Sequence, residues 1–411
     1  MSDSSAGFDS THPFRWEILL LFQAALAIFV FTVLVGILNG TDATDFEQKT
    51  LLTHVHTGTL GWLTLSVFAA SLWLFGQGEP LSDVARWSGR ILACGAVVSF
   101  LAFNYAFLTT YGVLRPQLGG AALAVILGFL LWVIGRARHV ELTTPHLGIL
   151  VAVGTSVIGG VIGVLWAILI ATGRDVLPDG AEDAHPATMV LGFLVPVGMA
   201  MAEWAFTWPR PERATRLGVV QMALPFVGGL LVMAGLFLDA TPLLGLSLPF
   251  EIMGVGIFVR RMWPYLRSFA RMGEARLRFA AASAAWIPVN IALFAYLVVA
   301  NQGDLDKAPD HEILALDHVM FIGAMTNAVL ALLLSALGKS AERWAGSDHL
   351  VFWCVNVTLV GFALGLFFDE TALKRVFTPL LGAALLLMIA TLTARLQARN
   401  VPAYAEALRR G

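Results

Sequence analysis

Long apolar segments, separated by short polar stretches, dominate the pattern of hydrophobic and polar positions along this chain. Each apolar segment has about 18 residues or more, the length at which a helix crosses the hydrocarbon core of a bilayer. The pattern predicts an all-α polytopic membrane protein with 12 transmembrane helices. The predicted spans are residues 16–39, 51–76, 88–111, 118–135, 147–172, 186–208, 217–238, 242–262, 279–300, 314–338, 348–368 and 376–394.

The composition supports a membrane protein with the lipid bilayer as its main partner. Of the 411 residues, 58% are hydrophobic and 13% are charged, whereas soluble domains carry roughly 25% charged residues. The net charge of −2 argues against a surface that binds nucleic acid. Cys94 and Cys354 lie inside apolar segments, so we expect no disulfide framework and no cysteine-based metal motif. No small-residue cleavage site follows the first apolar segment, which we interpret as a retained helix.

The distribution of Lys and Arg predicts the orientation of the chain in the membrane. The termini and the even-numbered loops hold 20 of the 26 basic residues, whereas the odd-numbered loops are acidic, as Asp42, Asp45 and Glu47 illustrate. Loops rich in Lys and Arg stay in the cytoplasm. We therefore expect both termini to be cytoplasmic, and the second, sixth and tenth helices to begin at the outer, acidic face.

Those three helices begin with related sequences. They read "HVHTGTLGWLT", "HPATMVLGFLV" and "LDHVMFIGAMT", and the glycines that align them, Gly61, Gly192 and Gly323, are equally spaced along the chain. Chance similarity between apolar helices is the alternative explanation. Equal spacing between polar landmarks favours a threefold repeat of four-helix modules. We expect one membrane domain of residues 1–411, built as three pseudo-repeated arcs of approximately 1–140, 141–272 and 273–411.

Histidines recur at the same spacing. His54 coincides with His185 when the chain is shifted by one repeat, and His56 coincides with His318 when it is shifted by two. Ionisable groups within membrane helices usually face the interior of a bundle and mark a site. A histidine near the surface that only bonds a loop carboxylate is the alternative for each of them. Neutral imidazole is a common metal ligand, so we take these four residues as candidate ligands.

Helix geometry separates the candidates on the second helix. His54 and His56 are about 200° apart around an α-helix, so both cannot face one pocket. We favour His56, whose repeat equivalent is His318, and expect Asp317 or an outer-loop carboxylate to orient an imidazole ring. Gly61 and Gly323 lie deeper on the same helices and leave space for a flat macrocycle. This arrangement suits a buried haem with axial imidazole ligands, and without a Cys-x-x-Cys-His motif it would be haem b.

The topology and two motifs resemble a known superfamily. Twelve helices in three arcs, with histidines on the outer side of the second, sixth and tenth helices, resemble subunit I of the haem–copper oxidases. "HVHTGTLGW" is similar to the second helix of short, divergent members. "LDHVMFIGAMTNAVLALLLSAL" is similar to a late helix of the NnrS family, haem-binding membrane proteins linked to nitric oxide metabolism and nitrosative stress.

The resemblance implies haem b held by His318 together with His56 or His54. It also implies a bacterial inner membrane with the histidines near its periplasmic face. The expected activity is redox chemistry of nitric oxide or oxygen, as an oxidoreductase with a small diatomic gas or a redox partner. The resemblance also implies a role in nitrosative-stress defence as an alternative.

The chain also departs from the oxidase pattern. His185–Pro186 is similar to the copper-binding start of the oxidase sixth helix, but the seventh predicted helix contains no histidine. Copper is therefore not expected in the usual three-histidine site, although it is possible elsewhere. Glu203 and Glu251 are the only candidates for proton delivery from the cytoplasmic half. A conventional proton-pumping oxidase is therefore not expected.

Two other function classes fit the same residues. One is a transporter or channel whose outer-face histidines bind a metal ion, since internal repeats are common among transporters. The other is an assembly partner of a respiratory complex. We expect the remaining histidines, His12, His139, His146 and His349, to lie in tails or loops and to be solvated.

Overall fold

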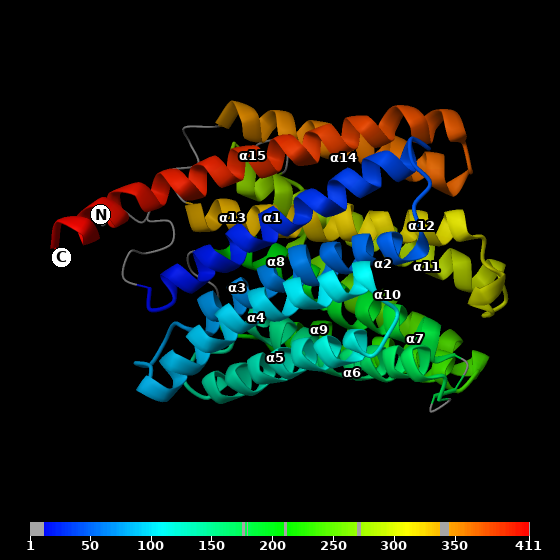
Figure 1. Ribbon diagram of the computed structural model, residues 1–411, viewed down its shortest axis with the longest axis horizontal. Coiled ribbons are helices and arrows are strands. Elements are labelled where there is room, and N and C mark those ends of the chain that lie inside the picture. Colours follow the sequence, from blue (N-terminus) through cyan, green and yellow to red (C-terminus); the bar gives the residue numbers. More distant parts are fainter. Residues whose placement is uncertain are drawn as a thin grey trace.

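The computed structural model describes residues 12–174, 177–178, 180–208, 212–268, 273–337 and 345–410. Within these residues lie 12 helices that are long and apolar enough to cross a membrane. Each predicted span overlaps one of them, so the predicted all-α fold class is confirmed. The helices run roughly parallel to one another along the long axis of the molecule (Figure 1).

Nine of the described spans form a closed ring. Each ring helix packs against the next in chain order, and the last packs against the first. The ring consists of α1 (Arg15–Gly40), α4 (Asp83–Thr109), α5 (Leu114–Ala137), α6 (Thr144–Thr172), α9 (Arg216–Phe237), α10 (Thr241–Leu266), α11 (Ala275–Ala300), α14 (Ala345–Phe367) and α15 (Thr371–Arg410). Three ring helices lie in each of the three predicted modules: α1, α4 and α5 in the first, α6, α9 and α10 in the second, and α11, α14 and α15 in the third.

The second, sixth and tenth spans lie inside this ring, and each is built from three segments. The second span is α2 (Gln48–His56), η1 (Thr57–Thr64) and α3 (Leu65–Phe75). The sixth is α7 (Ala181–Ala187), η2 (Thr188–Leu194) and α8 (Val195–Thr207). The tenth is α12 (Asp310–His318), η5 (Val319–Thr326) and α13 (Asn327–Leu337). A short 3₁₀ turn, η4 (Leu305–Lys307), precedes the tenth span.

Burial separates the inner spans from the ring. In the most apolar stretch of the inner spans 83–94% of the residues are buried, compared with 33–56% in the ring helices. The outer faces of the ring carry large apolar side chains, of which Trp87 and Leu131 are more than half exposed. Such a surface suits lipid, whereas soluble proteins rarely expose extended apolar patches.

A π-helical segment interrupts each inner span. The segments η1, η2 and η5 begin at Thr57, Thr188 and Val319, which are equally spaced and follow the same repeat as the aligned glycines. In η1 and η5 the hydroxyls of Thr64 and Thr326 each donate a hydrogen bond at 2.9 Å to the carbonyl five residues earlier. π-Helical turns are rare and occur often at functional sites. Their position beside the histidines therefore supports a functional site at this depth in the bundle.

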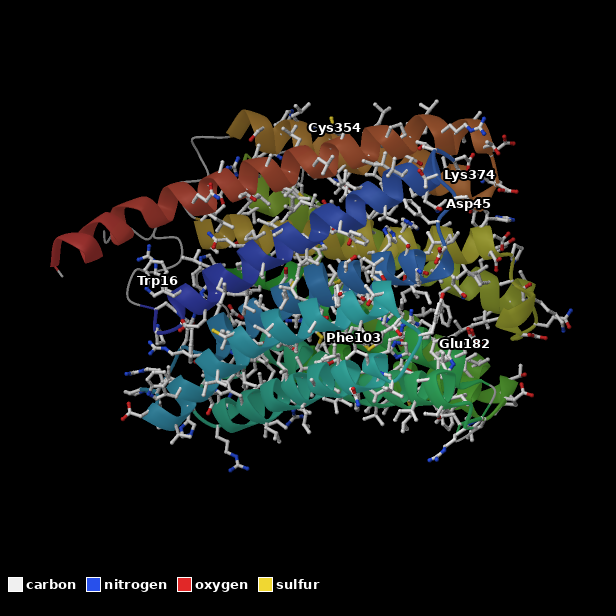
Figure 2. All side chains as sticks on the ribbon, viewed as in Figure 1. Trp16, Asp45, Phe103, Glu182, Cys354 and Lys374 are labelled. Atoms are coloured by element: carbon white, nitrogen blue, oxygen red, sulfur yellow. The ribbon has the colours of Figure 1, made fainter. Side chains whose placement is uncertain are left out.

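The two ends of the bundle differ in charge. The inner spans begin at the end where Asp45, Glu182 and Lys374 lie, whereas Trp16 lies at the opposite end (Figure 2). We call the first the acidic end. Helix α1 begins and α15 ends at the opposite end (Figure 1), as an even number of spans requires.

Candidate histidine centre

Four histidines lie on the inner spans at the acidic end. His54 and His56 are in α2, His185 is in α7, and His318 is the last residue of α12. All four are half-buried, and each lies directly before a π segment or within three residues of one. The structure thus gathers at one level of the bundle the four residues that the sequence repeat singles out.

His54 and His185 are held by the neighbouring ring helix. The Nδ1 of His54 donates to the Thr32 carbonyl of α1 at 2.8 Å, and the Nδ1 of His185 donates to the Gly159 carbonyl of α6 at 2.8 Å. A carbonyl can only accept a hydrogen bond, so the proton of each neutral ring is on Nδ1 and the lone pair is on Nε2. We call these the cross-helix histidines.

His56 and His318 are held by their own helices. Each Nδ1 donates to the carbonyl four residues earlier, to Leu52 at 2.8 Å and to Leu314 at 2.7 Å. We call these the own-helix histidines. In all four rings Nδ1 is therefore committed to backbone, and Nε2 makes no hydrogen bond to a residue in the described part of the chain. A carbonyl that fixes the tautomer and direction of a ring in this way is the usual companion of a metal-ligating histidine.

Glycines on the ring helices make room for the cross-helix histidines. A Cβ atom on Gly36 would lie 3.2 Å from Cε1 of His54, and one on Gly163 would lie 2.7 Å from Cε1 of His185. The spacing along the chain from Gly36 to Gly163 equals the spacing between the two carbonyl partners, Thr32 and Gly159. The same device therefore occurs in the first and second modules.

Each ring on the second span lies within electrostatic range of one ring on another inner span: His54 of His318, and His56 of His185. We call His54 with His318 the first pair and His56 with His185 the second pair. The sequence favoured His56 as the partner of His318. The electrostatic interaction instead associates His54 with His318, and which of the two shares a bound ligand with His318 stays a prediction. The rotation of about 200° between positions 54 and 56 turns the two rings toward different inner neighbours.

Aromatic side chains surround the own-helix histidines. The ring of His56 lies 4.3 Å from that of Phe107 and 5.4 Å from that of Phe103, both on α4. The ring of His318 meets Phe362 of α14 edge-on at 5.1 Å. Figure 2 shows Phe103 near the middle of the molecule in this view. Aromatic rings of the helix ring therefore pack against both own-helix imidazoles.

Three expectations about neighbouring residues need correction or restriction. The Leu314 carbonyl, and not Asp317, accepts the Nδ1 proton of His318. A Cβ on Gly61 would meet Ile28 of α1, and one on Gly323 would meet Trp286 of α11. Both glycines thus allow close packing between helices, and their contact with a cofactor stays a prediction.

One of the histidines expected in solvent is buried instead. His146 lies in the first turn of α6, where Nδ1 bonds Thr143 at 2.7 Å in a capping box and Nε2 bonds the Leu74 carbonyl at 3.2 Å. The prediction of a solvated loop residue was wrong here, because the Thr143 cap extends the helix toward the polar linker. His139 is exposed and pairs with Glu79 at 2.8 Å, as expected.

The two candidate proton-carrying glutamates have different environments. Glu203 accepts two hydrogen bonds from Arg261, both at 2.7 Å, and a third from Gln221. Glu251 is fully buried, and neither of its carboxylate oxygens has a hydrogen-bond partner among the described residues. Glu203 is therefore part of a structural ion pair, whereas Glu251 is an isolated acid inside the bundle.

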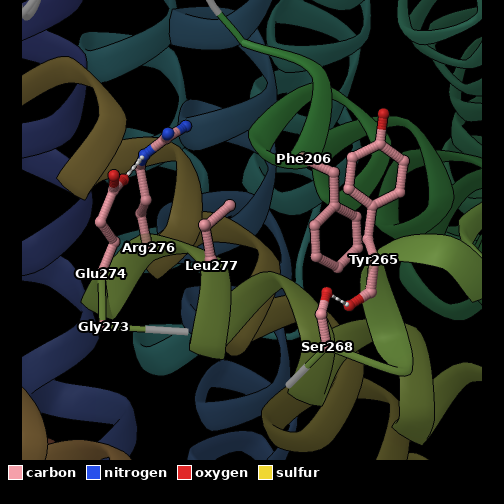
Figure 3. Close-up of a pocket in the computed structure, with 7 residues that line it drawn as sticks. All are labelled: Phe206, Tyr265, Ser268, Gly273, Glu274, Arg276 and Leu277. Atoms are coloured by element: carbon pink, nitrogen blue, oxygen red, sulfur yellow. Dashed lines mark hydrogen bonds and ion pairs between the residues drawn. The ribbon is translucent and has the colours of Figure 1, made fainter. Parts of the chain in front are cut away.

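An open groove of about 520 Å³ lies at the end of the molecule opposite the histidines (Figure 3). In it Phe206 and Tyr265 stack at 5.2 Å, and Arg276 pairs with Glu274 at 2.6 Å. It opens between the ends of α8 and α10 and the start of α11, so it is separated from the histidine pairs by most of the length of the bundle.

Comparison with known proteins adds no assignment: no protein-family model matches the chain, and no curated protein is similar to it. The fold and the exposed apolar ring define the class of the protein. It is an integral membrane protein with 12 spans, whose inner helices carry two pairs of oriented histidines.

Proposed function

We propose that the protein binds haem b, with His54 and His318 as axial ligands between the second and tenth spans. One observation carries this proposal. Each ring commits Nδ1 to a backbone carbonyl, so Nε2 is left as the only ligating nitrogen, and the two rings lie on neighbouring inner helices.

The residues fit the requirements of haem. Haem iron accepts two axial imidazoles, whereas zinc usually takes four ligands and copper three or more. The carbonyls of Thr32 and Leu314 fix the two rings, and Phe362 adds an apolar wall beside His318. Bound haem would supply one-electron redox chemistry, and the surrounding inner spans would keep water away from it.

The broader role follows from the resemblance described above. A ring of helices around three inner spans, with histidines at the start of each, agrees with an oxidase-like protein of the NnrS type. We propose a role in redox chemistry of nitric oxide or oxygen, or in defence against nitrosative stress, in a bacterial inner membrane. The charge distribution favours cytoplasmic termini and histidines near the periplasmic face.

Copper has no place in the conventional position under this proposal. In the oxidases the seventh helix supplies two histidines, and α9 contains none. His185, the resemblance's remaining copper ligand, donates Nδ1 to Gly159 and lies within range of His56. These neighbours favour His185 as a ligand of haem iron over His185 as one of three histidines that bind copper.

A transporter is the second candidate, favoured by the buried and unpartnered carboxyl of Glu251. Isolated acids inside membrane bundles often belong to proton or ion pathways. In that case the histidine pairs would bind a metal ion at the entrance to the pathway.

An optical spectrum separates the two candidates. Protein expressed with a haem supply and purified in detergent should show a Soret band, and its pyridine haemochrome should be of the b type. The matched control is His139→Ala, which removes an exposed histidine and should leave the spectrum unchanged. Protein that is folded and free of haem, and that binds Zn²⁺ or Cu²⁺ instead, would favour the transporter.

A further inference from the structure

The two histidine pairs occupy two of three equivalent interfaces. The sequence repeat places cross-helix positions at 54, 185 and 316, and own-helix positions at 56, 187 and 318. Each pair combines the cross-helix position of one inner span with the own-helix position of another. The third interface, between the sixth and tenth spans, has Ala187 and Leu316 at these positions.

We propose a second haem site between the second and sixth spans, with His56 and His185 as its axial ligands and Arg115 as the partner of a haem carboxylate. The proposal rests on the proposed function for the kind of cofactor, but it concerns a different interface and different residues. It assigns two haems to one chain.

The ligand geometry of this interface repeats that of the first. His56 donates Nδ1 to Leu52 as His318 donates to Leu314, and His185 donates to α6 as His54 donates to α1. Both Nε2 atoms are thereby available. Gly163 keeps the space beside His185 open, so the ring keeps the orientation that its bond to Gly159 sets.

A buried arginine beside His56 supplies an independent observation. Arg115 is 2% exposed and lies within electrostatic range of His56. Its guanidinium donates to the Phe107 carbonyl at 2.7 Å and lies over the rings of Phe107 and Tyr111 at 4.0 and 4.3 Å. Within the described chain its Nε has no hydrogen-bond partner, and no carboxylate forms a salt bridge with it.

A buried guanidinium without a carboxylate partner is costly. An anionic group that enters the interface would remove this cost by accepting the free N–H in a charge-assisted bond. Haem b carries two carboxylates and needs two axial ligands, so it satisfies both the arginine and the imidazoles. A bare metal cation would satisfy the imidazoles but would be repelled by the guanidinium.

The repeat links this arginine to the histidines. The segments "FLTTYGVLR", "FLDATPLLG" and "FFDETALKR" place Arg115, Gly245 and Arg375 at equivalent, equally spaced positions. Arginine therefore occurs in the two modules whose own-helix position is histidine, and glycine occurs in the module that has Ala187. At the acidic end Arg375 is exposed and pairs with Asp42 at 3.1 Å. Of these two arginines, Arg115 is thus the one without an acidic partner in the described chain.

The test is the number of haems per polypeptide in the purified full-length protein, measured by pyridine haemochrome against quantitative amino-acid analysis. We expect two for the wild type. His185→Ala and His54→Ala should each lower the number to one, and the double variant should contain none. Low-temperature EPR of the oxidised protein should show two low-spin signals, of which each single variant loses a different one.

Two further variants separate ligation from folding. Leu316→Ala changes the equivalent position at the third interface and should leave two haems. Arg115→Gln should shift the midpoint potential of the haem that is lost in His185→Ala. It should leave the midpoint potential of the other haem unchanged. Arg115→Lys, which keeps the charge, should restore most of that shift.

The outcomes distinguish this inference from the proposed function. A wild type with one haem that His54→Ala removes and His185→Ala retains overturns the second site and leaves the proposed function intact. One haem that only His185→Ala removes overturns the proposed ligand pair and retains this site. Haem-free protein overturns both.

Discussion

The indole N–H of Trp62 donates to the hydroxyl of Thr326 at 3.1 Å and joins two inner spans at their π segments. The two residues are each eight positions beyond a histidine of the first pair, Trp62 after His54 and Thr326 after His318. Thr326 in turn donates to the carbonyl of Phe321. The bond therefore links the π-helical segment η5 of the tenth span to the second span, which carries His54.

Trp62→Phe should lower the stability of the protein and loosen the first histidine pair. The lost interhelical hydrogen bond should cost about 1 kcal/mol, somewhat less if the membrane environment weakens it. The midpoint of thermal unfolding in detergent measures the cost. Trp263→Phe is the matched control, because Trp263 is 58% exposed on the ring surface. Equal midpoints for the two variants would contradict a coupling role.

Gly163→Ala should selectively disturb the second pair. The added Cβ would lie 2.7 Å from His185 Cε1, closer than side-chain atoms normally approach, so the imidazole has to move. The low-spin EPR signal assigned to His56 and His185 should be lost or shifted, while the other signal stays. Gly154→Ala on the same helix is the control, since nothing lies within 4 Å of its Cβ. A Gly163→Ala protein with both signals intact would show that the ring direction does not matter.

Glu203→Ala should destabilise the protein without changing its optical spectrum. The change leaves Arg261 without its two bonds of 2.7 Å, and breaking a buried ion pair from one side typically costs about 3–5 kcal/mol. Asp304→Ala, which breaks an exposed pair with Lys307, should leave the stability nearly unchanged, because water screens exposed ion pairs. Chemical denaturation in mixed micelles measures both. A spectral change in Glu203→Ala would instead give this carboxylate a role at the cofactor.

The predicted orientation can be checked by labelling in intact cells. In a background with Cys94 and Cys354 replaced by serine, Glu182→Cys on the acidic end should react with a membrane-impermeant maleimide added from outside. Asp83→Cys, at the start of α4, should react only after the membrane is opened. The reverse pattern would place the histidine pairs near the cytoplasmic face.

The sequence predicted the spans and the level of the histidines well, for simple physical reasons. Spanning helices need long apolar segments, and the repeat placed His54, His56, His185 and His318 at equivalent depths. Equivalence alone does not tell which positions face each other. His56 and His318 are equivalent in the repeat, so they occupy the same position on two different inner spans. Each is therefore expected near a cross-helix histidine of another span and not near the other.

Other parts of the site had no clear signal in the sequence. Thr32 and Gly159 accept the histidine hydrogen bonds with backbone carbonyls. Every residue has such a carbonyl, so the residue type gives no sign of this role. The π segments depend on backbone register and packing, although their hydroxyl bonds at Thr64 and Thr326 are visible as a threonine repeat once the register is known. The predicted spans 88–111 and 118–135 leave Arg115 in a loop, and its burial is a property of the tertiary structure.

The most direct test of the account is the EPR spectrum of oxidised His54→Ala and His318→Ala proteins, compared with the wild type and His56→Ala. If His54 and His318 bind one iron, the two variants lose the same low-spin signal, and His56→Ala retains it. Each variant should elute as the wild type does in size-exclusion chromatography. If His56→Ala and His318→Ala lose the same signal while His54→Ala retains it, the pairing across the interface is wrong. If none of the variants changes a haem signal, these histidines do not bind haem.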